Sequence, residues 1–195
     1  MSKYQSKREK IMGEGVSKSK KIKWEYILPA AALISVVVYF MLSNNVSTNP
    51  VIENSPIVFK KGVKYGTQPL QMKTVKDVVI NNGELSIPIS AVKDSKIVYY
   101  EYSKDGKTVP LMSFITASGK LVSAVSMCEP CNSNKFHIEG DKLVCNFCDT
   151  IWTLDGLYGI EGGCINYPPD VIRSTIKGNR VYLSEQEIRN WKRRV

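Results

Sequence analysis

Alternating apolar and polar positions in the middle of the chain predict a small antiparallel β domain. Residues 85–90 alternate between apolar residues and serine or proline, which is the period of a half-buried strand. Residues 96–103 are β-branched and aromatic and lead into Lys104-Asp105-Gly106, a hairpin signal. Segments 108–116 and 120–127 follow after short turns. Consecutive strands with short connections are typical of an antiparallel meander.

The last residues predict a short C-terminal helix. Ser184 can cap its first turn, and Glu187 follows three residues later, which completes a capping box. We expect the helix to cover about 185–194 and to turn Ile188 and Trp191 inward.

The N-terminal region has the pattern of a membrane anchor. Residues 26–43 carry no charge, and a bilayer core of roughly 30 Å needs about 20 helical residues. Residues 1–23 contain eight lysines and arginines but two glutamates, and an excess of Lys and Arg marks the cytoplasmic side. The pattern therefore predicts a basic cytoplasmic tail at 1–23, a single transmembrane helix at 24–43 and an extracytoplasmic remainder.

A cleaved signal peptide is the main alternative to this anchor. Its small-residue cleavage site should follow the apolar run, yet Ala30-Ala31-Ala32 lies inside it. Residues 44–58 are rich in Asn, Ser and Pro, which favours a flexible linker. The remaining segment, 59–195, is the predicted domain.

Charge and composition limit the class of function. The 195 residues carry a net charge of +9, much of it in the basic tail, so the remainder is only mildly basic and does not indicate nucleic-acid binding. The sequence also offers no acid–base pair or placed nucleophile, so we do not expect an enzyme with a substrate of its own.

The five cysteines are clustered and carry the candidate chemistry. Two Cys-x-x-Cys pairs, which we call the first and second knuckle, are Cys128 with Cys131 and Cys145 with Cys148. Each knuckle can present two sulfurs to one centre, and four sulfurs complete the tetrahedral set shared by zinc and iron–sulfur sites. The 13 residues between the knuckles fit one small hairpin. These four cysteines are the predicted metal ligands.

Other interpretations of the cysteines remain open. Two disulfides are one alternative, because an extracytoplasmic compartment can be oxidising. A thioredoxin-like dithiol is less consistent with the pattern, since that motif begins a helix after a parallel strand. Cys164, on a Gly-Gly turn, is a buried small residue, a further ligand or a thiol beside the centre. His137 is expected to be structural or exposed rather than a ligand, and Phe147 and Trp152 are expected to pack over the site.

Residues 83–183 resemble the membrane iron–sulfur protein family called FtrD-like. The shared features are an Ile-Pro strand, a Tyr-Tyr strand, both Cys-x-x-Cys knuckles with Gly-Asp before the second, and a terminal Gly-Gly-Cys. In this chain they are Ile87-Pro88, Tyr99-Tyr100, Cys128 to Cys131, Gly140-Asp141 before Cys145, and Gly162-Gly163-Cys164. One departure is that Ile165 follows Cys164, where the family pattern has Asn-Pro.

The resemblance implies an iron–sulfur cluster bound by these five cysteines, an extracytoplasmic site and, for some members, association with ferrous-iron uptake permeases. We therefore expect a membrane protein of electron transfer with a permease or redox partner. A structural zinc module, a mononuclear iron site and a copper chaperone are the alternatives. The segment from Cys145 to Pro169 is also similar to a Rieske cluster loop, but Rieske sites need two histidines and the chain has one.

Overall fold

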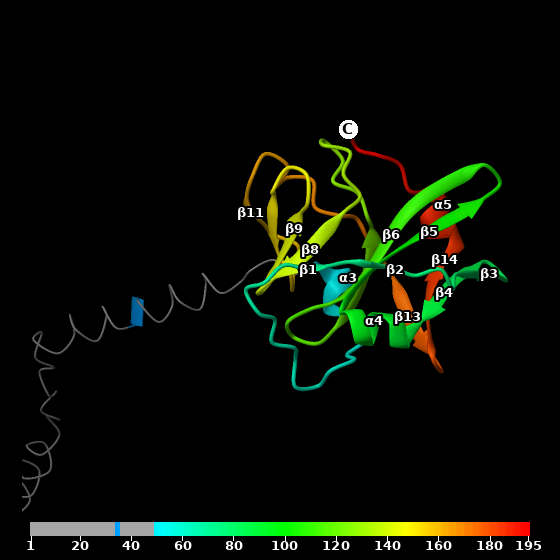
Figure 1. Ribbon diagram of the computed structural model, residues 1–195, viewed down its shortest axis with the longest axis horizontal. Helices are drawn as coiled ribbons and strands as arrows, with labels where there is room; N and C mark the ends of the chain where they lie inside the picture. The colour runs from blue at the N-terminus through cyan, green and yellow to red at the C-terminus, as the bar shows by residue number, and fades with distance from the viewer. Residues whose placement is uncertain (1–33, 36–48) are drawn as a thin grey trace, which may run out of the picture. The chain divides into compact units, whose positions relative to one another are not determined.

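The computed structural model describes residues 34–35 and 49–195 (Figure 1). The chain divides into two units, Met1–Ser47 and Thr48–Val195. The predicted tail and, apart from Ile34 and Ser35, the predicted transmembrane segment lie outside the described residues. Within the described part, no helix is both long enough and apolar enough to cross a membrane.

Three β-sheets build the second unit, and Figure 1 shows the central one between the other two. The central sheet has the strand order β12-β7-β6-β5-β2. Its strands are β2 (Lys73–Thr74), β5 (Ile97–Lys104), β6 (Lys107–Ile115), β7 (Leu121–Val125) and β12 (Val171–Ile172). Strands β5, β6 and β7 are the predicted meander, whereas β2 pairs with β5 in parallel.

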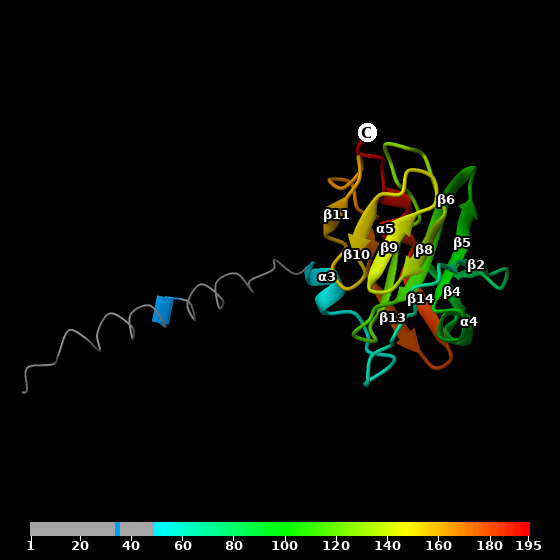
Figure 2. The ribbon, with the colours of Figure 1, turned by 60° about the vertical axis from the view of Figure 1, so that its left-hand side comes forward.

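The two outer sheets are antiparallel throughout. One has the order β1-β8-β9-β10-β11, and Figure 2 shows its middle strands side by side. Its strands are β1 (Leu70–Gln71), β8 (Phe136–Glu139), β9 (Lys142–Cys145), β10 (Ile151–Thr153) and β11 (Gly159–Glu161). The other has the order β13-β14-β4-β3. Its strands are β3 (Val79–Asn81), β4 (Glu84–Pro88), β13 (Ser174–Lys177) and β14 (Arg180–Ser184).

The central hairpin follows from its turn residues. Asp105 and Gly106 join β5 to β6 and have φ angles of 52° and 75°. Two consecutive positive φ angles are those of a type I′ turn, whose twist matches that of the flanking strands. The pairing then runs without a break from Lys104↔Lys107 to Ile97↔Phe114. This confirms the predicted hairpin.

Both faces of the central sheet are buried, so the domain has two cores. Alternate residues of β5–β7, among them Tyr100, Leu111 and Leu121, enter the first core, which β4, β14 and two helices complete. Their neighbours, among them Met112 and Phe114, enter the second core beneath β8–β10. The cysteines belong to the second core. The cysteine region therefore packs on one face of the meander and not on the other.

Two local predictions differ from the structure. The alternation over 85–90 predicts a strand through Ile89, but the strand ends at Pro88 and Ile89–Ser95 forms helix α4. Pro88 is the N-cap of this helix, and because proline has no N–H to donate to a β-ladder, it suits the end of the strand. The C-terminal helix α5 covers Glu185–Asn190 and is capped by Ser184 as predicted, but it ends earlier.

The described part of the predicted linker packs on the domain. Pro50–Glu53 forms the short helix α3, and Ile52 is buried in the second core. Farther along, Val58 and Phe59 both donate backbone hydrogen bonds, of 2.8 and 3.0 Å, to the carbonyl oxygen of Gly119. These contacts tie the segment to the β6–β7 turn.

We predict that Gly119→Ala destabilises the domain by detaching this segment. Gly119 has a φ of +85°, and an added Cβ would lie 2.0 Å from the carbonyl oxygen of Phe59. Strain and overpacking together should cost roughly 2–4 kcal/mol of unfolding free energy. Gly106→Ala is the matched control, because Gly106 also has a positive φ but no atom within 4 Å of the added Cβ. Equal losses in chemical denaturation would contradict this prediction.

Candidate metal centre

The two knuckles lie at neighbouring turns beside the central sheet. The first follows β7, and an isolated bridge between Cys128 and Ser133 closes it. The second begins at the end of β9, where Cys145 pairs with Phe136 of β8. The predicted hairpin thus consists of β8 and β9, which turn at Gly140-Asp141 and return the chain to the first knuckle.

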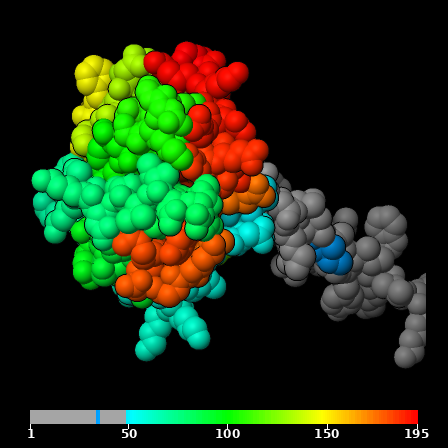
Figure 3. All heavy atoms as spheres, turned by 90° about the vertical axis from the view of Figure 1, so that its right-hand side faces the viewer, coloured from blue at the N-terminus to red at the C-terminus, as the bar shows by residue number. Residues whose placement is uncertain are grey.

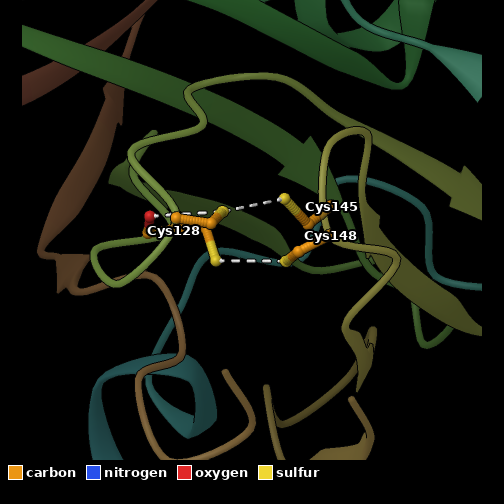
Figure 4. A group of neighbouring side chains, drawn as sticks. Cys128, Cys145 and Cys148 are labelled. Carbon is orange, nitrogen blue, oxygen red and sulfur yellow. Dashed lines mark hydrogen bonds between the residues drawn. The ribbon is translucent and has the colours of Figure 1, made fainter. Parts of the chain in front are cut away.

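The structure brings all four knuckle sulfurs together. The Sγ atoms of Cys128 and Cys148 lie 3.7 Å apart, as do those of Cys131 and Cys145. All four lie within 4.8 Å of one another. Figure 4 shows the sulfurs of Cys128, Cys145 and Cys148 facing one another across the space between the knuckles.

This spacing fits a metal bound by four thiolates. With metal–sulfur bonds of about 2.3 Å, the edge of a tetrahedron around one ion is roughly 3.8 Å. A tetrahedral set of four sulfurs is typical of zinc and iron–sulfur sites. The spacing is that around one ion, whereas the four-thiolate donor type is the one that iron–sulfur cofactors also use. The described cysteines are free thiols rather than disulfides.

The environment of the sulfurs is uneven. Cys128 and Cys145 are buried, whereas Cys131 and Cys148 are half-buried. Burial is the main cause that raises the pKa of Cys128 above its usual range and the pKa of Cys131 to about 11. Burial acts in the same direction on Cys148, but hydrogen bonds from the hydroxyl and backbone of Thr150 and from Cys131 and Cys145 together outweigh it and lower the pKa to about 6. Since metals bind thiolates, loading the site must release protons.

Cys164 lies beside the four knuckle cysteines. It is buried, and its Sγ atom is 3.8 Å from that of Cys148. Its backbone N–H donates a 3.2 Å hydrogen bond to the hydroxyl oxygen of Thr150. Gly162 makes this approach possible, because a Cβ there would come within 2.7 Å of the Thr150 Cα atom. The structure thus places Cys164 next to the centre, at the edge of the four-sulfur group.

The other residues singled out from the sequence have different roles. His137 contacts the side chain of Asn146 at 2.7 Å, and Asn146 donates in turn to Gln71, so His137 supports the second knuckle. Trp152 is fully buried against Phe136, as expected of a residue packed over the site. Phe147 does not pack there. Its exposed fraction of 74% corrects the expectation for this residue.

A buried ion pair at the first knuckle was not predicted from the sequence. Glu129, between the two cysteines, is 1% exposed and accepts hydrogen bonds from the Arg194 guanidinium at 2.5 and 2.6 Å. Burial favours the neutral carboxyl, but these hydrogen bonds hold the pKa of Glu129 below its usual range. Arg194 also donates to the carbonyl oxygen of Pro168 and pairs with Asp170.

These contacts fasten the C-terminal residues to the site. Arg193 adds hydrogen bonds of 2.5 Å to the Asn132 side chain and to the Glu129 carbonyl oxygen. In Figure 3 the red C-terminal segment lies beside the yellow-green segment that holds the first knuckle. Arg194 thereby joins the first knuckle to the loop that follows Cys164.

We predict that Arg194→Ala destabilises the domain far more than the loss of a surface pair would. Removing the guanidinium leaves the buried Glu129 carboxylate without a charged partner, with the backbone N–H of residue 194 as a remaining donor. The loss should cost about 2–3 kcal/mol, somewhat reduced because the Arg194 side chain is 35% exposed. Arg173→Ala is the control, since Arg173 is 78% exposed in its pair with Glu187 and should cost less than about 1 kcal/mol. Chemical denaturation of the metal-loaded protein measures both, and equal losses would count against the prediction.

We predict a division of labour among the five cysteines. Cys128→Ser should lose nearly all bound metal and loosen the second core, because metal binding contributes to folding free energy. The first core contains no cysteine and should keep its hydrogen-exchange protection. Cys164→Ser should retain most of the metal. Metal analysis of anaerobically prepared protein tests this, and the reverse pattern of loss would show that the ligands are assigned wrongly.

The chain shows limited similarity to curated proteins and to solved structures. No curated protein matches the chain. Among solved structures, the chain is similar to one in "Complex of reduced oxygenase and oxidized ferredoxin in carbazole 1,9a-dioxygenase", with 17% sequence identity and a TM-score of 0.43, over 54% of this chain and 95% of that one. A similarity at this level carries no conclusion about function.

A family model gives the more specific result. The model described as "Membrane iron-sulfur containing protein FtrD-like" matches residues 92–195. The match covers more than half of the chain and includes both knuckles and Cys164. It confirms the resemblance and the expected iron–sulfur cofactor at the level of the family. On this match, the chain belongs to the FtrD-like family of membrane iron–sulfur containing proteins.

Proposed function

We propose that this chain is a membrane-anchored iron–sulfur protein that transfers single electrons outside the cytoplasm. The observation that carries the proposal is the convergence of four cysteine sulfurs within 4.8 Å in a chain of an iron–sulfur family. An iron–sulfur centre, when bound, supplies one-electron redox chemistry.

The residues of the chain would hold this centre and control its access to solvent. Cys128 and Cys145 would bind it from the buried side, and Cys131 and Cys148 from the side that reaches the surface. Trp152 and Phe136 close the inner side against water. A centre with one face near the surface suits electron exchange with a docked protein, because the partner need not open the domain.

The location and partner belong to the same proposal. The apolar segment 24–43 would anchor the chain once, with the basic residues 1–23 in the cytoplasm and the domain outside. The partner would be a membrane redox protein or permease, and handling of electrons during ferrous-iron uptake is the role that the family resemblance favours. Anchoring both proteins in one membrane would raise their effective concentration.

A structural zinc site is the second candidate, because the same tetrahedral set of four sulfurs suits zinc as well as iron. Zinc has no redox chemistry, so such a site would only stabilise the knuckles. The two functions can therefore be separated by the metal and by its response to reductant.

We predict that the chain purified anaerobically from iron-replete cells carries iron, absorbs visible light and is bleached reversibly by one electron per centre. Iron, zinc and acid-labile sulfide are measured together with a redox titration. A Cys145→Ser variant is the control and should lose both colour and iron. Stoichiometric zinc without iron, in protein never exposed to oxygen, would favour the structural alternative.

A further inference from the structure

Thr150 is a fully buried hydroxyl residue between the second knuckle and β10. Its Oγ1 atom lies 3.2 Å from the Cys148 sulfur and 3.2 Å from the backbone nitrogen of Cys164. Its own carbonyl oxygen accepts a 3.0 Å hydrogen bond from the backbone N–H of Cys145. Thr150 thus contacts both cysteines of the second knuckle and the loop of the fifth.

The direction of the hydroxyl hydrogen bond follows from its partners. A backbone N–H can only donate, so the Thr150 oxygen is the acceptor toward Cys164. The one hydroxyl hydrogen is then left for the remaining partner, the sulfur of Cys148. The loop that carries Cys164 therefore orients the hydroxyl through its backbone amide.

The position of the hydroxyl is also sterically restricted. The Gly162 backbone passes so close that an added Cβ there would lie 2.6 Å from Thr150 Oγ1. Close packing of this kind excludes water from the hydroxyl and restricts its rotamers. A hydrogen bond in a dry site is also stronger than one in water.

We infer that Thr150 raises the reduction potential of the centre by donating a hydrogen bond to the Cys148 thiolate. This inference rests on the proposed function and gives a role to the Gly162-Gly163-Cys164 loop. Hydrogen bonds to ligating sulfur withdraw negative charge, and they stabilise the reduced state, which is the more negative one. Thr150 is a positioning residue, since it acts through Cys148.

The test compares Thr150→Val, which keeps the shape but removes the hydroxyl, with Thr150→Ser, which keeps the hydroxyl. Thr153→Val is the matched control, because Thr153 lies three residues farther along, at the end of β10, and its hydroxyl accepts from the Tyr158 amide instead of facing a sulfur. In the iron-loaded full chain, Thr150→Val should make reduction roughly tenfold less favourable, a potential about 59 mV lower for one electron. Thr150→Ser and Thr153→Val should stay near the parent value.

A second measurement separates this inference from the proposed function. In the full chain loaded with Co²⁺ alone, loss of the hydrogen bond makes the sulfur a better electron donor, so the sulfur-to-cobalt absorption band should move to longer wavelength in Thr150→Val. Thr150→Ala serves as a second variant if the valine protein does not fold. An unshifted band in both Thr150→Val and Thr150→Ala would overturn the role of Thr150, whatever metal the protein holds in cells. A shift in Thr150→Ser equal to that in Thr150→Val would overturn it as well.

Discussion

Burial of the central sheet on both faces is the constraint on which the rest of the domain depends. Away from its exposed turn, the β5–β6 hairpin is buried on both faces, so each outer sheet must supply an apolar face. One face is closed by β4 and β14, without any cysteine. The other is closed by the short strands β8–β10, and the cysteines of both knuckles pack into the core that these strands cover. The metal centre is thus part of one core and independent of the other.

Such short strands need support beyond backbone pairing. Strands β8 and β9 have four residues each, and hairpins of this length have marginal stability alone. Trp152 and Phe136 pack against each other in the same core as the cysteines, and Arg194 pairs with Glu129 of the first knuckle. The sulfurs are thus surrounded by residues from distant parts of the sequence.

The sequence predicts the features that depend on local pattern. Asp105-Gly106 identifies the central hairpin, Ser184 the start of the final helix, and the paired spacing of the knuckle cysteines the four-sulfur group. The sequence does not predict the features that depend on contacts between distant residues. Glu129 and Arg194 are 65 positions apart, and a basic residue near the chain end is usually solvated. Phe147 shows the converse, since its aromatic character suggested packing and its side chain is exposed.

The attachment of Arg193 and Arg194 has a consequence for how long the protein retains its metal. Arg193 and Arg194 follow the last helix and donate hydrogen bonds to Glu129 of the first knuckle. Loss of these contacts would leave every described strand in place, and it would leave the Glu129 charge enclosed. A molecule without them would keep its circular dichroism yet exchange its metal faster, so the lifetime of the bound metal would report on whether Arg193 and Arg194 are in place.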